Sequence, residues 1–138
     1  MSELVECAIA SAMSRFLLVS LGGAIGSGAR YLVSSGTHRL LGTALPVGTL
    51  AVNIVGSFLI CLLMHLALSA NLIGPELRLF LTTGILGGFT TYSAFGHETF
   101  QFARQGSYAP AMLYVSATVV LCVAAGYAGD ALARLLAS

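Results

Sequence analysis

Apolar residues dominate the chain in four long runs, separated by short stretches richer in glycine, proline and polar side chains. A helix that crosses a membrane needs about 20 mostly apolar residues. Each run is long enough, so the pattern predicts an all-α membrane protein with four transmembrane helices. The expected segments are residues 15–35, 47–69, 76–104 and 110–136.

The third run is interrupted near its middle by residues 84–96, which are rich in glycine and threonine. Glycine weakens a helix and β-branched threonine stiffens it, so the third helix is expected to break here. A break at membrane depth exposes backbone groups that lipid cannot satisfy. Such backbone persists only where it is buried in protein or faces water or an ion. We therefore interpret this stretch as the functional centre.

Composition supports the membrane assignment and excludes several functions. Hydrophobic residues make up 57% of the chain and charged residues only 8%, with a mean hydropathy of +0.93. Soluble domains carry about 25% charged residues. No run of basic residues is present that would hold nucleic acid. The sequence also contains no paired acids, no nucleophile with a base and no phosphate-binding loop, so we do not expect an enzyme.

The start of the chain differs from the rest. Residues 1–13 carry Glu3 and Glu6 where a signal peptide would carry positive charge. We expect residues 1–13 to be a weakly ordered, dispensable extension and residues 14–138 to form the four-helix transmembrane domain.

Several polar side chains fall inside the apolar runs. Gly22, Gly26 and Arg30 recur every fourth residue, which predicts a close helix contact with Arg30 at its end, reaching the interface or a polar cavity. Asn53 should face protein or water, and the sequence leaves open whether it bonds another helix or a ligand. Glu98 is costly in lipid unless it is paired, and we expect it to hold the broken helix in place.

Two further patterns have more than one interpretation. Tyr92 and Phe95 share a helix face beyond the break, a spacing that is, in isolation, typical of core packing. Tyr114, Thr118 and Cys122 recur every fourth residue in the last helix. This stripe either satisfies itself by bonding carbonyls one turn back or lines a narrow aqueous track.

The positions of the arginines hardly indicate how the chain is oriented in the membrane. With four spans, one side of the membrane would hold Arg15, Arg78 and Arg134. The other side would hold Arg39 and Arg104, and also Arg30 if its side chain reaches that interface. The positive-inside rule is then nearly balanced. We expect the chain to insert both ways round and to pair as an antiparallel, dual-topology homodimer.

Taken together, three motifs resemble a known family, the Fluc (CrcB-type) fluoride channels. The resemblance covers roughly residues 15–136. Its marks are a glycine-rich first helix ending in Gly28-Ala29-Arg30-Tyr31, the run Gly48-Thr49-Leu50-Ala51-Val52-Asn53, and the run from Thr83 to Phe95. Glu98 also falls where the family has an acid.

The resemblance implies a multi-pass protein of the bacterial inner membrane that passes fluoride through two pores of an antiparallel homodimer. It implies a central structural Na⁺ held by the main-chain carbonyls of Gly87 and Thr90, and a vestibule position for Arg30. The implied fluoride-pore residues are Asn53, Tyr92, Ser93, Phe95, Tyr114 and Thr118. Amides, hydroxyls and the positive edges of aromatic rings suit a small, strongly hydrated anion.

The chain departs from the family pattern at four positions. Tyr92 stands where the family usually has Phe, Ala94 where it has Thr or Ser, and Gly96 where it has Ser. Cys122 replaces a usual hydroxyl in the last helix. Two alternatives to a homodimeric fluoride channel are a non-conducting subunit of a heterodimeric channel and a proton-coupled small multidrug exporter. The exporter would need an acid in the first helix, and residues 15–35 contain none.

Overall fold

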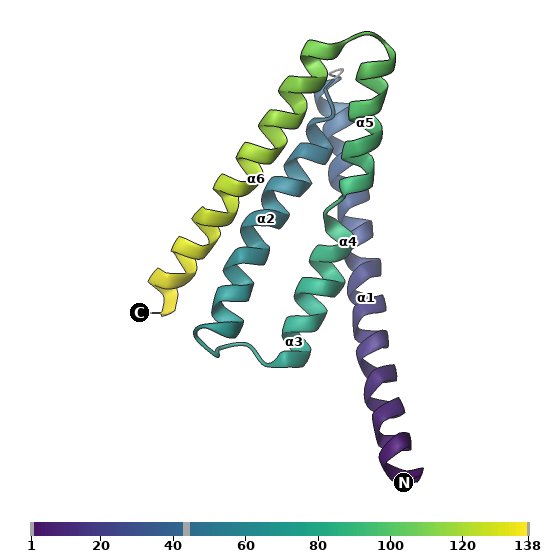
Figure 1. Cartoon of the computed structure of the whole chain (residues 1–138), viewed down its shortest axis with the longest axis vertical. Coiled ribbons are helices and arrows are strands. Elements are labelled where there is room, and N and C mark those ends of the chain that lie inside the picture. The colour runs from purple at the N-terminus through teal and green to yellow at the C-terminus, as the bar shows by residue number, and fades with distance from the viewer. Residues whose placement is uncertain (1, 43–44, 138) are drawn as a thin grey trace.

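A computed structural model describes residues 2–42 and 45–137, and within them all regular structure is helical (Figure 1). Three helices are long: α1 (Ser2–Leu41), α2 (Val47–Leu68) and α6 (Tyr108–Ala137). Among the described residues these three are long and apolar enough to cross a membrane. Residue 1 of the predicted extension, positions 43–44 of the first loop and residue 138 lie outside the described residues.

Helix α1 is longer than the sequence predicted at both ends. Residues 2–13, expected to be weakly ordered, continue the helix and project beyond the other helices (Figure 1). They contain no glycine or proline that would stop a helix. At the other end the helix runs through Gly36 to Leu41 and stops at Gly42. The positive φ of Gly42 (54°) and its amide bond to the His38 carbonyl form a left-handed cap.

The third segment is broken, as predicted. It begins with α3 (Pro75–Leu79), where Pro75 has a φ suited to the first helical turn. It continues as the π-helical segment η1 (Phe80–Leu86) and the short α4 (Gly87–Phe89). Thr90 and Thr91 are extended, and α5 (Tyr92–Arg104) then starts. The break therefore lies within the glycine- and threonine-rich stretch.

Small residues allow the helices to approach closely. A Cβ atom placed on Gly26 would lie 2.0 Å from the Ile85 carbonyl oxygen, and one on Gly22 would lie 2.8 Å from Cα of Gly84. The predicted contact face of α1 is thus confirmed, and η1 and α4 are its partners. The α2–α6 pair is built in the same way, because a Cβ on Gly129 would lie 2.1 Å from the Phe58 carbonyl oxygen.

Little of the apolar surface is buried within one chain. Among the described side chains larger than alanine, only Val52 is fully buried. Phe16, Leu32 and Leu113 each leave about two-thirds of their surface exposed (65%, 69% and 65%). Apolar surface on this scale is typical of contact with lipid or another chain, not with water.

Candidate functional site at the helix break

The side chain of Asn53, on α2, holds the break in the third segment. Its Nδ2 donates to the Thr91 carbonyl (3.1 Å), and its Oδ1 accepts from the Thr91 amide (2.8 Å). Thr91 is only 8% exposed, so both of its backbone groups need partners. These hydrogen bonds join α2 to an extended residue of the break, and a ligand role for Asn53 stays a prediction. The two contacts use one N–H of the Asn53 amide and do not involve the second.

The break redirects two backbone amides away from carbonyls that they would bond in a continuous helix. The Thr91 amide, which would reach Gly87, donates to Asn53. The Ala94 amide, which would reach Thr90, donates to Thr91 Oγ1 (3.2 Å). The carbonyls of Gly87 and Thr90, which the family resemblance implies as cation ligands, therefore lose their helical donors.

Arg30 reaches the same break from α1. Its Nε donates to the Gly88 carbonyl (3.1 Å), and Ser27 Oγ lies 3.5 Å from the same oxygen. Arg30 also lines a cavity of about 330 Å³ together with Thr49 and Glu98. Of the two positions predicted for it, Arg30 therefore occupies the border of a polar cavity.

Three aromatic rings gather beyond the break. The ring centroids of Tyr92 and Phe95 are 5.7 Å apart, and those of Phe95 and Tyr114 are 5.3 Å apart, both tilted. These are favourable geometries for aromatic pairs. Tyr92 is nevertheless 84% exposed in the single chain, so its outer face is not core packing within this chain.

Glu98 joins three helices through its carboxylate. Thr49 Oγ1, on α2, donates to one oxygen (2.6 Å), and the Tyr114 hydroxyl, on α6, donates to the other (2.7 Å). Both distances are those of charge-assisted bonds. These contacts meet the requirement that an acid in an apolar run be hydrogen-bonded.

Most of the predicted site residues converge on one cavity of about 410 Å³. Its lining includes Asn53, Gly87, Thr90, Tyr92, Phe95 and Thr118. Tyr114 and Ser93 are absent from that lining, although Ser93 Oγ lies 3.3 Å from Thr91 Oγ1. Thr118 donates to the Tyr114 carbonyl (2.7 Å), so at this position the stripe on α6 satisfies itself.

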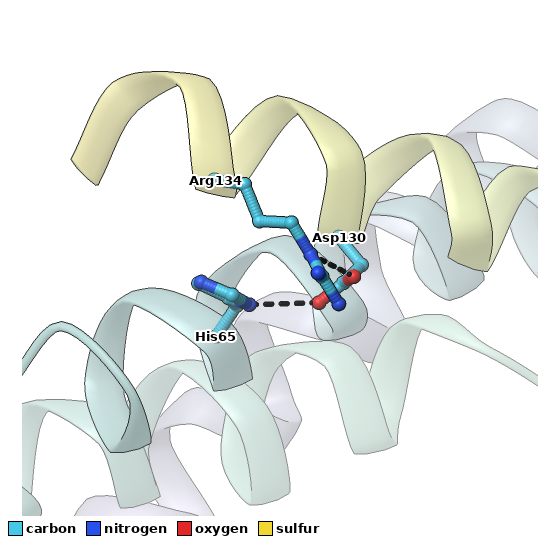
Figure 2. A network of polar contacts seen from close by, with 3 residues as sticks. All are labelled: His65, Asp130 and Arg134. Carbon is cyan, nitrogen blue, oxygen red and sulfur yellow. Dashed lines mark hydrogen bonds and ion pairs between the residues drawn. The ribbon is translucent and has the colours of Figure 1, made fainter. Parts of the chain in front are cut away.

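Sequence reasoning missed three features of the site. Thr91 caps α5 and pairs with Asn53, and Thr49 binds Glu98. A third feature lies at the other end of α2, where His65, Asp130 and Arg134 form a polar cluster (Figure 2). The fourfold spacing of Asp130 and Arg134 was the available signal for part of it.

A comparison with family models matches most of the chain. Residues 17–130 match the family model described as CrcB-like protein, Camphor Resistance (CrcB). The chain belongs to the CrcB family. Because this match spans most of the chain, it includes the break, Asn53 and Glu98 together.

Relatives with curated names extend the comparison. The chain is 51% identical over 125 residues to a protein of Anaeromyxobacter dehalogenans named "Fluoride-specific ion channel FluC", covering 91% of this chain and 99% of that protein. It is 48% identical over 124 residues to a protein of the same name from Geobacter sulfurreducens, covering 90% of this chain and all of that protein. A relative from Agrobacterium fabrum with this name is also 48% identical.

The family and the helices together fix the cellular setting. The family consists of ion channels, which are transport proteins and not enzymes. With its long apolar helices, the chain is a multi-pass integral protein of the bacterial inner membrane.

Proposed function

We propose that this protein is a fluoride-selective channel that lets cells shed cytoplasmic fluoride passively. The observation that carries the proposal is the 51% identity to a fluoride-specific channel over 99% of that relative's length. In acidic surroundings fluoride enters cells as neutral HF, which dissociates in the near-neutral cytoplasm. The inside-negative membrane potential then drives the anion out, so no nucleotide or proton coupling is required.

The conducting form in this proposal is an antiparallel homodimer of chains with four spans, the broken segment being the third. The near balance of arginines between the two sides supports it. So does the exposure of functional groups on one chain: Tyr92 is 84% exposed, and Gly87 is exposed beside the open cavity. A second copy would cover these groups and complete the pore walls.

Within the pore, fluoride would exchange water for donors of this chain. The second N–H of Asn53 and the hydroxyl of Ser93 are such donors, and the rings of Tyr92 and Phe95 can present positive edges. Tyr114 and Thr118 currently donate to Glu98 and to a backbone carbonyl. For these two to bind the ion, their hydroxyls would have to turn away from those acceptors. None of these groups carries a fixed positive charge, which would hold the anion too tightly.

A structural Na⁺ at the dimer centre is part of the proposal. The carbonyls of Gly87 and Thr90 fit this role, because the break removes their helical amide donors and Na⁺ prefers oxygen ligands of this kind. When bound, the ion would supply positive potential near the anion path. Arg30 would keep the neighbouring Gly88 carbonyl occupied and the break in place.

The test is fluoride release from liposomes that contain the purified protein. Vesicles loaded with potassium fluoride receive valinomycin, and a fluoride electrode follows release. Chloride-loaded vesicles and the Asn53→Asp variant serve as controls. Fast fluoride release without chloride release, abolished by Asn53→Asp, is expected. Silence of a correctly assembled wild-type dimer would overturn the homodimeric channel and favour a subunit that needs a different partner chain.

A further inference from the structure

A three-residue charge cluster joins the ends of two helices. The ring Nδ1 of His65 lies 2.8 Å from Asp130 Oδ1, and Arg134 Nε donates to Asp130 Oδ2 at 2.9 Å. Figure 2 shows both partners meeting the one carboxylate, His65 from α2 and Arg134 from the next turn of α6. Each oxygen of the carboxylate thus has its own donor.

The cluster borders a groove along α2 and α6. This groove has a volume of about 700 Å³, and both His65 and Asp130 line it. Ser57 and Cys122 line it too, and they also line the cavity of about 410 Å³ that contains Asn53. The two spaces are therefore adjacent, and the groove leads from the helix break toward the ends of the helices.

An unpaired carboxylate at this position would oppose the passage of an anion. Asp130 keeps 34% of its side-chain surface exposed, so its field reaches the groove. Arg134 cancels the negative charge, and His65 directs an N–H toward it. Charged groups at the end of a pathway alter ion entry by attraction or repulsion, and this effect depends on ionic strength.

We propose that two positioning residues act on Asp130 at the mouth of the fluoride path: Arg134 neutralises its carboxylate, and His65 holds that carboxylate in place. This inference rests on the proposed function, since it concerns the passage of fluoride. If Arg134 had a purely structural role, its removal would mainly reduce stability. Arg134 is 70% exposed, and an exposed ion pair between residues four apart contributes little to stability. Removing Arg134 should therefore affect ion entry more than folding.

The test measures fluoride release at two ionic strengths, about 0.01 M and about 1 M, set with an impermeant salt, between which the Debye length falls from about 30 Å to about 3 Å. Arg134→Gln should slow release about threefold at low ionic strength and have little effect at high ionic strength. Asp130→Asn/Arg134→Gln should restore the wild-type rate. Arg15→Gln is the matched control, because Arg15 lies on the same side but lines a different cavity.

Several results would overturn the inference. An equal slowing at both ionic strengths, no slowing at all, or no rescue by Asp130→Asn would each contradict charge neutralisation. If Arg134→Gln does not assemble as a dimer, Asp130→Asn alone decides the matter: release should equal or exceed the wild-type rate, and slower release contradicts the proposal. A wild-type protein that releases no fluoride would instead refute the proposed function itself.

Discussion

The side chain of Asn53 forms both a donor and an acceptor bond with the backbone of Thr91, at 3.1 and 2.8 Å. The pairing resembles one rung of a β-ladder, built between a helix side chain and an extended residue. It allows two non-helical residues to persist inside an apolar segment, because the backbone groups that lipid cannot satisfy are satisfied by α2. The same contact orients the Asn53 amide beside the cavity that contains Tyr92 and Phe95.

Replacing Asn53 by leucine should cost stability as well as function. The change leaves two buried backbone groups of Thr91 without partners, for which we expect a loss of about 2 to 4 kcal/mol in the free energy of unfolding. Reversible denaturation in mixed micelles, followed by circular dichroism, measures it. Asn53→Asp keeps an acceptor for the Thr91 amide, so it should lose less stability while still abolishing fluoride release. Equal stability of Asn53→Leu and wild type would contradict this account of the break.

The contact between α1 and η1 predicts a position-specific effect of adding one methyl group. Gly26→Ala would place Cβ 2.0 Å from the Ile85 carbonyl oxygen, so the two helices must separate. We expect a loss of about 1 to 3 kcal/mol in unfolding free energy, as in other overpacked contacts. Gly23→Ala is the matched control on the same helix, because its Cβ would meet nothing within 4 Å. A Gly23→Ala variant as unstable as Gly26→Ala would contradict this account, because alanine favours a helix more than glycine does and meets no neighbour at position 23.

Local signals in the sequence were sufficient for part of this fold. Glycine and threonine within 84–96 located the break, and the fourfold spacing of Gly22 and Gly26 identified the contact face of α1. Both depend on residues near each other in the chain. The full length of α1 was missed, because Gly36 does not end a helix and the cap at Gly42 depends on a backbone angle.

The contacts that complete the site were less accessible, because they depend on the register between distant helices. Asn53 and Thr91 are 38 residues apart, and His65 and Asp130 are 65 residues apart. The sequence indicated that Asn53 and Glu98 needed partners, from the cost of burying polar groups. It did not identify Thr91 and Thr49 as those partners, nor Asp130 as the partner of His65. Each choice requires knowing how α2 lies against α5 and α6.

The Glu98 carboxylate and the two hydroxyls that donate to it, those of Thr49 and Tyr114, should behave as one unit. Tyr114→Phe removes one of the two donors to the carboxylate, and Glu98→Gln removes its charge. We expect each change alone to cost about 1 to 3 kcal/mol, and the double variant to cost clearly less than the sum. A double-mutant cycle on unfolding free energies measures the coupling. Tyr108→Phe, an exposed tyrosine at the start of α6, is the control. Additive costs for Tyr114 and Glu98 would contradict a direct bond.

Removing residues 2–13 should leave conduction unchanged. Although these residues are helical, they project beyond the other helices (Figure 1). Val5, Ile9 and Met13 are all more than half exposed, at 53%, 59% and 54%, so the deletion removes little packing. We expect the shortened protein to match wild type in dimer assembly, melting temperature and fluoride release.

The comparison for this deletion is a second one that extends further, to residue 23. That longer deletion removes Gly22, which lies against Gly84, and should therefore lower the melting temperature. A loss of fluoride release after removal of residues 2–13 alone, with assembly intact, would contradict the prediction. It would assign the projecting helix a role in ion passage, because its removal would then have changed function without changing the contacts that hold α1 to η1.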